Sequence, residues 1–185
     1  MNRTHIIAVI GDSNTVKGSE PDRFAEKLGE LIIDQGWRIM TGGLGGIMES
    51  AARGARKSSK WSPGCIIGLL PGNDPDKANS YIDTPIPTGL DHGRNLIVSQ
   101  ADAVIAIGGG AGTLSEIALA WVYFRLIVAF RGSGWAGEMA DRKVDERSRY
   151  PDFPEDQVFG CDIPEEAIDI IKKYLPFYTR RHHGI

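Results

Sequence analysis

Cysteine is scarce in this sequence, with only Cys65 and Cys161 among 185 residues and no Cys-x-x-Cys pair. So low a count is typical of a reducing compartment, although spacing alone leaves a disulfide between the two open. Cys65 lies inside an apolar run and is expected to be a buried small hydrophobic residue. Long hydrophobic runs are also absent: none approaches the roughly 18 residues of a membrane-spanning helix, and the apolar part of the N-terminal segment is too short for a signal peptide. The sequence therefore predicts a cytoplasmic protein with no membrane partner.

The chain also lacks an excess of basic residues. Its formal net charge is −3, with 24% charged and 42% hydrophobic residues, as in an ordinary soluble globular protein. Sequence-independent binding to nucleic acid usually requires a basic domain or stripe, so we expect no nucleic-acid partner. The adjacent His182 and His183 stand in the tail and are expected to be solvated, and we expect no metal site.

Short apolar runs alternate with longer helical patterns along the chain. At this length the chain is expected to form one domain spanning 1–185. Because the predicted strands are apolar nearly throughout, they favour a mostly parallel sheet with helices on both faces. The predicted fold class is therefore α/β, a doubly wound, Rossmann-like single domain. The predicted strands are 5–11, 37–43, 64–71, 103–107 and 126–132, with a shorter extended piece at 82–89, and the predicted helices are 21–36, 45–59, 93–101, 113–124 and 164–175.

Two segments depart from this alternation. Residues 132–157 are charged, punctuated by glycine and proline, and longer than an ordinary connection, so we expect a surface insertion or lid there. The end of the chain, 176–185, is expected to be a flexible tail.

Glycines and small polar residues gather where three of the predicted strands end. In open α/β sheets, ligands bind beyond the carboxyl ends of the strands. Glycine lets a ligand approach main-chain N–H groups closely, and a helix that begins directly after the turn adds free N–H groups and a positive dipole end. The alternative for each turn is that its glycines serve only a tight bend. Together the three turns predict a site for a phosphorylated small molecule, formed by Asp12, Ser13, Asn14, Gly42, Gly43, Gly45, Gly46, Gly109, Gly110, Gly112 and Thr113.

These turns do not match either of the common nucleotide fingerprints. The P-loop pattern is absent because no lysine follows the glycines. The first turn holds only Gly11, where a dinucleotide site requires Gly-x-Gly-x-x-Gly.

Two charged side chains adjoin the glycines of the third turn. Thr113 and Glu116 fit a capping box, in which the acid reaches back to a backbone N–H; the alternative is that Glu116 binds the ligand or acts as a general acid or base. Arg94, on the helix before strand 103–107, is either a phosphate ligand or a solvated helix residue. His92 is a weaker candidate, because a lone loop histidine is usually solvated.

The stretches "MTGGLGGIMESAARGA" and "GRNLIVSQADAVIAIGGGAGTLSEIALAW" resemble the LOG-like Rossmann superfamily. Its members were long labelled possible lysine decarboxylases and carry a Pro-Gly-Gly-x-Gly-Thr-x-x-Glu signature. The resemblance covers roughly residues 5–131, with Gly108 in place of the signature's proline. The matching residues are Gly109, Gly110, Gly112, Thr113 and Glu116.

The resemblance implies one of two functions. The nucleosidase branch cleaves the N-glycosidic bond of nucleoside 5′-monophosphates and needs an Arg-Lys pair before the strand; those positions read Gly93-Arg94 here, which counts against hydrolysis. The molybdenum-cofactor carrier branch is more similar, with a single arginine followed by asparagine and then the glycine-rich turn. It implies binding of a phosphorylated pterin, molybdopterin or the molybdenum cofactor, with the phosphate at the glycine-rich turns and no bond broken. A third reading is a domain that senses a nucleotide without turnover.

Whether the protein is an enzyme stays open at this point. If it is, the resemblance implies a nucleoside 5′-monophosphate N-glycosidase with Glu116 and Arg94 as catalytic residues. A lysine decarboxylase is not expected, because no lysine stands in a pyridoxal-phosphate context. The relatives associate through helices that flank the site, so the resemblance also implies a homodimer or homotetramer.

Overall fold

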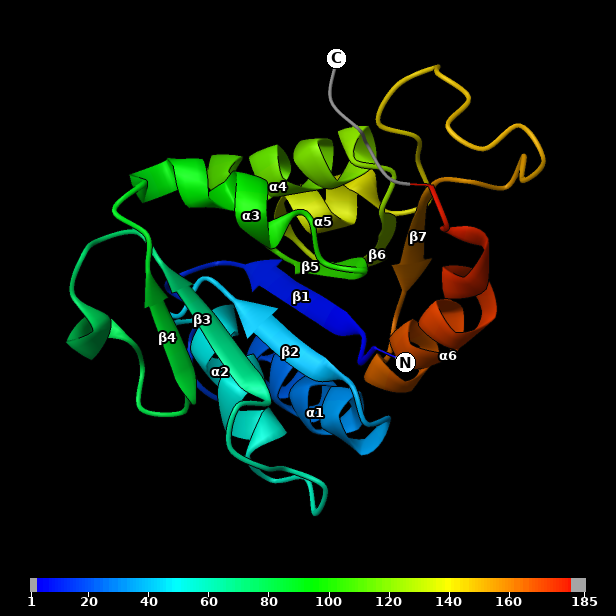
Figure 1. Ribbon diagram of the computed structural model, residues 1–185. Coiled ribbons are helices and arrows are strands. Elements are labelled where there is room, and N and C mark those ends of the chain that lie inside the picture. Colours follow the sequence, from blue (N-terminus) through cyan, green and yellow to red (C-terminus); the bar gives the residue numbers. More distant parts are fainter. Residues whose placement is uncertain (1–2, 181–185) are drawn as a thin grey trace.

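A computed structural model describes residues 3–180 of the chain. Seven strands in this range form one sheet in the order β4-β3-β2-β1-β5-β6-β7, and all neighbouring strands run parallel (Figure 1). This confirms the predicted doubly wound α/β fold. The strands are β1 (Ile6–Gly11), β2 (Arg38–Thr41), β3 (Ile66–Leu70), β4 (Thr84–Pro87), β5 (Ala103–Ile107), β6 (Leu126–Phe130) and β7 (Val158–Cys161). The helices are α1 (Glu20–Asp34), α2 (Ile47–Ala55), α3 (Asn95–Val98), α4 (Ala111–Val122), α5 (Gly134–Met139) and α6 (Pro164–Tyr174), with short 3₁₀ turns η1 (Pro75–Lys77), η2 (Asp91–Arg94) and η3 (Leu175–Phe177).

Burial of the strands follows their position in the sheet. Every residue of the central strands β5 and β6 is buried, as expected for parallel strands covered on both faces. β4 lies at one edge and is mostly exposed. It contains Pro85 and Pro87, which have no N–H to donate and are therefore tolerated on an edge strand.

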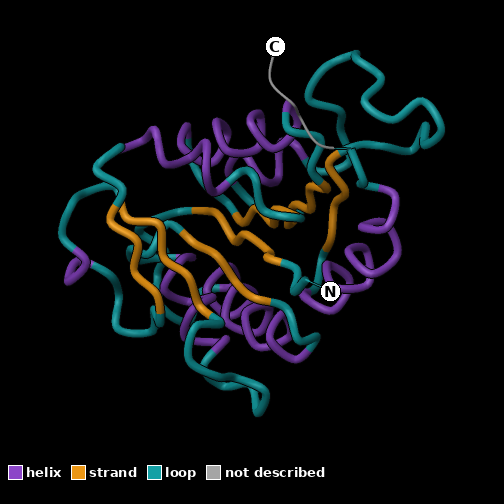
Figure 2. The backbone as a smooth tube through the Cα atoms, in the orientation of Figure 1, coloured by secondary structure: helices purple, strands orange, loops and turns teal. Residues whose placement is uncertain are grey.

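Helices cover the sheet on both faces (Figure 2). α1, α2 and α6 pack on one face and bury Phe24, Leu28 and Ile168. α3, α4 and α5 pack on the other and bury Ile117 and Trp121. Each large apolar side chain buried in this way contributes about 1.5–3 kcal/mol, so the two cores together fix the sheet between its helix layers.

α1 and α2 approach each other closely through glycine. A Cβ atom at Gly29 would lie 1.9 Å from the carbonyl oxygen of Ala51, and one at Gly54 would lie 1.7 Å from that of Glu26. Arg53 of α2 donates a 2.8 Å hydrogen bond to Asp22 of α1. These contacts hold the position of α2, whose N-terminus faces the end of β1.

The segment 132–157 contains more regular structure than its sequence predicted. It begins with α5, which is only six residues long and contains two glycines, so it gives no helical pattern of apolar residues. β7 follows the segment directly and was also missed, because its four residues come straight after a charged stretch. Between them, residues 140–157 form an irregular loop that projects from the body of the protein (Figure 1).

This loop is anchored by one buried ion pair. Arg149 is 4% exposed, and its Nε donates a 2.8 Å hydrogen bond to Oδ2 of Asp156. The same guanidinium donates to the carbonyl oxygens of Trp121 and Arg125, at 3.1 Å each. Its Cζ lies 3.6 Å from the centre of the Trp121 ring. The loop is therefore tied to α4 and to the turn before β6.

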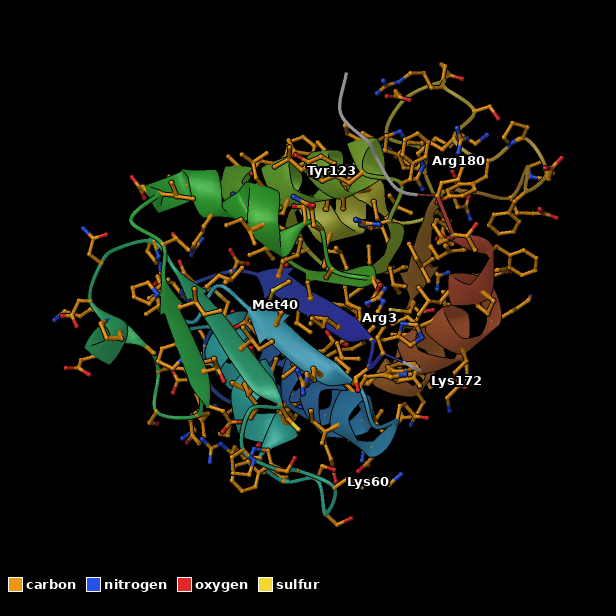
Figure 3. The ribbon with its side chains drawn as sticks, viewed as in Figure 1. Arg3, Met40, Lys60, Tyr123, Lys172 and Arg180 are labelled. Atoms are coloured by element: carbon orange, nitrogen blue, oxygen red, sulfur yellow. The ribbon has the colours of Figure 1, made fainter. Side chains whose placement is uncertain are left out.

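The described part of the expected flexible tail is packed against the same loop. Tyr178 is 2% exposed, and its hydroxyl donates a 2.6 Å hydrogen bond to Asp156. Arg180 donates to the carbonyl of Arg149, and Figure 3 shows it beside the loop. Of residues 176–180, Tyr178 is buried against the loop and the others are exposed, whereas 181–185, with both tail histidines, lie outside the described residues.

None of the helices formed by residues 3–180 combines the length and the apolar character needed to cross a bilayer. The two cysteines are free thiols. Cys161 is buried, but Cys65 is only half-buried, because it lies just before β3 at the amino end of the sheet.

Candidate functional site

A cavity of about 350 Å³ opens at the carboxyl ends of β1, β2 and β5. β1 and β5 are neighbours at the point where the strand order reverses, which is where open α/β sheets bind their ligands. The lining residues come from the end of β1 and the loops after β1 and β2, from α2, from η2 and α3, and from the start of α4. They are Ile10, Gly11, Asp12, Ser13, Gly42, Leu44, Met48, His92, Arg94, Asn95, Gly110, Gly112, Thr113 and Glu116.

The turn between β5 and α4 is held on both sides. Gly108 and Gly109 have φ values of 62° and 92°, a left-handed conformation that favours glycine. Their carbonyl oxygens accept hydrogen bonds from the N–H groups of Ala136 and Trp135 in α5, at 3.0 and 2.9 Å. On the other side, Oδ2 of Asp12 accepts a 2.9 Å hydrogen bond from the Gly109 N–H. The amide of Gly109 is thus already engaged by the protein.

The first turn of α4 leaves its N–H groups available to a ligand. Within residues 3–180, no acceptor takes the N–H groups of Gly110, Gly112 or Thr113, as expected where a helix begins. All three residues line the cavity. Together with the positive end of the helix dipole they form a place for an anion.

α4 begins earlier than the sequence pattern indicated. Its first residue is Ala111 and its N-cap is Gly110, with no side-chain capping bond. Thr113 is therefore the third residue of the helix rather than its cap. The capping-box interpretation of Thr113 and Glu116 is wrong, because the glycine turn lets the helix start two residues before the threonine.

Arg94 points into the cavity from the end of η2. A Cβ atom at Gly42 would lie 2.8 Å from Nη2 of Arg94 and 2.6 Å from Sδ of Met48, so a larger residue there would displace these two side chains. Nη1 makes a long hydrogen bond of 3.3 Å to the Asn95 side chain. Nε is buried, and no acceptor for it exists among residues 3–180. Burial lowers the pKa of Arg94, and the nearby charges of Glu116 and Asp91 oppose that shift.

Glu116 lies one turn further along α4 and is 8% exposed. Burial raises the pKa of this carboxyl to about 7, against the opposing effect of the Arg94 charge. No hydrogen-bond donor reaches its carboxylate from the part of the chain that the structure describes. An unpartnered carboxyl at the wall of a cavity is therefore available to a ligand in both protonation states.

Of the residues expected to bind a ligand, the structure brings eight together and leaves five outside the cavity wall. Asp12, Ser13, Gly42, Arg94, Gly110, Gly112, Thr113 and Glu116 line the cavity; Asn14, Gly43, Gly45, Gly46 and Gly109 do not.

Most of the five outside the wall have a structural role instead. The Gly43 N–H donates to Oγ1 of Thr41 at 3.0 Å. Gly46 has φ 63°, and a Cβ atom there would lie 2.1 Å from the Asp12 carbonyl oxygen. That same oxygen accepts a 2.8 Å hydrogen bond from the N–H of Ile47, the first residue of α2. The glycines after β2 thus let the loops after β1 and β2 pack tightly together.

The sequence analysis did not select six of the lining residues. Ile10, Leu44 and Met48 belong to apolar patterns that indicate core, and nothing in the sequence marks them as ligand contacts. Asn95 follows Arg94 directly, which was the available signal. It is 4% exposed, and its Nδ2 donates a 2.8 Å hydrogen bond to Oγ of Ser115 on α4. It therefore joins the α3 and α4 walls of the cavity. Gly11 completes the set together with His92, which the sequence analysis named only as a weaker candidate.

Metal ligands do not gather anywhere among residues 3–180: no group of three or more His, Cys, Asp and Glu side chains is arranged to hold an ion.

The sequence of this chain is similar to a described protein family and to a curated relative. The family model of the SLOG cluster4 family matches residues 4–158. A curated but uncharacterized protein of Archaeoglobus fulgidus is 42% identical over 115 residues, covering 62% of this chain and 72% of that protein.

Two solved structures are similar over nearly the whole chain. The molybdenum cofactor binding protein of Rippkaea orientalis is 32% identical with a TM-score of 0.76, covering 94% of this chain and 98% of that one. The molybdenum cofactor carrier protein of Chlamydomonas reinhardtii is 27% identical with a TM-score of 0.73, covering 94% and 99%.

Proposed function

This chain belongs to the SLOG cluster4 family, and on that premise we propose that it binds a phosphorylated pterin of the molybdenum-cofactor type as a carrier, without cleaving it. The two solved relatives that bind or carry molybdenum cofactor support this choice of ligand. The phosphate would lie over the start of α4, and the ring system would lie toward β2.

One observation carries the proposal. The N–H groups of Gly110, Gly112 and Thr113 face the cavity with no acceptor among residues 3–180, and the buried Nε of Arg94 lacks one too. The buried Nε of Arg94 is costly to leave without an acceptor, and a phosphate supplies several acceptor oxygens to this nitrogen and to the three amides.

The rest of the cavity fits a flat heterocycle. Ile10, Leu44 and Met48 give it apolar surface, and the volume of about 350 Å³ is within the range of small-molecule sites. The side chains of Asp12 and Ser13 give it hydrogen-bonding groups. The chain's role in this proposal is to bind, orient and shield the ligand.

Retention of molybdopterin tests the proposal. Purified protein is mixed with molybdenum cofactor released from a cofactor-containing protein, separated by ultrafiltration, and assayed for pterin by fluorescence after oxidation. We expect Arg94→Gln to lower the affinity about 10- to 150-fold, because a hydrogen bond to a charged group contributes about 1.5–3 kcal/mol.

Arg38→Gln is the matched control, since Arg38 is exposed at the amino end of β2, away from the cavity. It should retain the pterin as the unchanged protein does. Equal loss in both variants, or no retention by the unchanged protein, would contradict the proposal.

A second candidate function is hydrolysis of nucleoside 5′-monophosphates. It is favoured by Glu116, whose pKa of about 7 keeps much of this carboxyl protonated near neutral pH, beside the arginine. Such an acid could protonate the departing base, and Arg94 would hold the 5′-phosphate. The protein is incubated with AMP and related monophosphates, and free base is sought by chromatography. Turnover that disappears in Glu116→Gln would replace the carrier proposal with this one.

We propose that the protein is cytoplasmic and forms a homodimer or homotetramer. Leu96 and Ile97 of α3 and Val122 of α4 are 40–44% exposed, which supports an interface on this helix layer. Sedimentation of the protein as a monomer would contradict it.

A further inference from the structure

Arg94 and Glu116 both line the cavity, and their side chains do not bond to each other. They influence each other electrostatically, yet they form no ion pair or hydrogen bond within residues 3–180. The Nε of Arg94 is buried without an acceptor. Glu116 is 8% exposed, and its carboxylate accepts no hydrogen bond within residues 3–180. A space lined by an unpaired donor and an unpaired carboxyl fits a ligand group that can bond to both.

We propose that the anionic group of the ligand lies between Arg94 and Glu116, and that Glu116 takes up a proton as this group binds. The inference rests on the proposed function, in that the ligand is a dianion such as a phosphate monoester. One oxygen of the dianion accepts hydrogen bonds from the Arg94 guanidinium. Another accepts from the protonated carboxyl of Glu116, whose proton comes from the solvent.

The charges around the cavity make proton uptake necessary. Arg94 is the one permanently charged cation among the lining residues, and Asp12 adds a negative charge on the β1 side. Oδ2 of Asp12 is held by the Gly109 N–H, so the Asp12 carboxylate stays at the entrance to the anion site. An ionised Glu116 would add a second carboxylate, besides Asp12, against the dianion in a buried place, which is unfavourable.

The other charged groups near Glu116 do not supply a positive charge that would replace proton uptake by Glu116. Asp91, on η2, acts on Arg94 with the same sign as Glu116. His92, on the same turn, lines the cavity and is exposed. Because His92 also carries an ionisable side chain at the cavity, the experiment must separate it from Glu116.

The direction of the pH dependence follows from linkage. The free protein holds Glu116 with a pKa of about 7, and a neighbouring dianion raises that pKa further. The bound form then carries more protons than the free form above pH 7. Affinity therefore falls as pH rises through this range, by at most about tenfold per pH unit. A ligand bound near neutral pH is released more readily in alkaline solution.

Calorimetric titration of the full-length protein with AMP, and with inorganic sulfate as an anion that does not titrate, measures this uptake. The binding enthalpy is compared in Tris and Hepes at pH 7.5, since the two buffers release protons with different enthalpies. We expect a buffer-dependent enthalpy that corresponds to uptake of a fraction of a proton, up to one, with both anions. Equal enthalpies in the two buffers would overturn the inference.

Two variants identify the group that takes up the proton. Glu116→Gln, which mimics the protonated acid, should bind with an affinity independent of pH, tighter than the unchanged protein at pH 8.5, and without proton uptake. His92→Asn should still take up the proton. Uptake that persists in Glu116→Gln and disappears in His92→Asn would assign it to the histidine and refute the inference.

Failure of the inference is distinct from failure of the proposed function. Binding of AMP or sulfate without proton uptake refutes only the role of Glu116. If neither anion nor molybdopterin binds, the proposed function fails and the inference falls with it. The thermal unfolding midpoint of Glu116→Gln without ligand checks that the variant is folded.

Discussion

Gly112→Asp is expected to lower the affinity for a phosphorylated ligand about a hundredfold while leaving the protein folded. Gly112 lines the cavity in the first turn of α4, and a Cβ atom there meets nothing within 4 Å. The new carboxylate therefore fits, and an acidic side chain in a first helical turn is favourable to the helix. It would occupy the amides meant for the phosphate and repel a dianion. A repulsion of about 2.7 kcal/mol, moderate for charges a few ångströms apart near a protein surface, corresponds to that hundredfold loss.

Gly112→Asn is the matched control, with the same size and no charge. It should lose at most about tenfold, so that the difference between the two variants measures the electrostatic part. Binding of molybdopterin or AMP by fluorescence or calorimetry gives both values. If Asp and Asn lower the affinity equally, the effect is steric, and the anion does not bind at the start of α4.

Arg149→Met is expected to destabilise the fold by about 3–5 kcal/mol, the usual cost of removing one partner of a buried ion pair. The substitution leaves Asp156 buried at 4% exposure, with the Tyr178 hydroxyl as a remaining donor. It also removes the hydrogen bonds to the carbonyls of Trp121 and Arg125. Denaturant unfolding followed by circular dichroism measures the change in free energy of unfolding.

Arg147→Met is the matched control, because it removes the same charged group from an exposed position two residues earlier. Arg147 is 71% exposed and pairs with Asp145 at the surface, where an ion pair contributes about 0–1 kcal/mol. The double variant Arg149→Met with Asp156→Leu should recover part of the loss, since it removes the stranded carboxylate. Equal destabilisation by the 147 and 149 substitutions would show that residues 140–157 are not anchored as described.

The central part of the fold could be predicted because its elements are locally consistent. β5 and β6 are unbroken apolar runs, α1 ends at the left-handed Gly36, and α6 begins with Pro164 and shows a clear apolar face. The LOG-like resemblance rested on the turn between β5 and α4, and the family match confirms it.

What the sequence did not reveal depends on contacts between distant residues. α5 is a single short helix that is stabilised by bonding to the β5 turn, 26 residues earlier in the chain. β7 is recognisable only beside β6, which it pairs with in parallel.

The same holds for the site. That Asp12 would engage the Gly109 amide, and that Gly46 would lie against the Asp12 carbonyl oxygen, requires the loops after three strands to be placed relative to one another. Local spacing carries no such information. The spacing indicated that these turns need glycine. It does not distinguish a glycine needed for close packing from one needed for ligand access.

The support that α5 gives to the β5 turn has a mechanical consequence. The peptide planes of Gly108 and Gly109 are oriented by the N–H groups of Ala136 and Trp135, and a Cβ atom at Gly134 would lie 2.7 Å from the Gly108 carbonyl carbon. The start of α5 and the β5 turn are therefore in close backbone contact. Trp135 is 40% exposed, so the backbone N–H that holds the Gly109 carbonyl belongs to a residue whose side chain lies at the surface. The conformation of the glycine turn that leads into the cavity-lining start of α4 therefore depends on α5, none of whose residues lines the cavity.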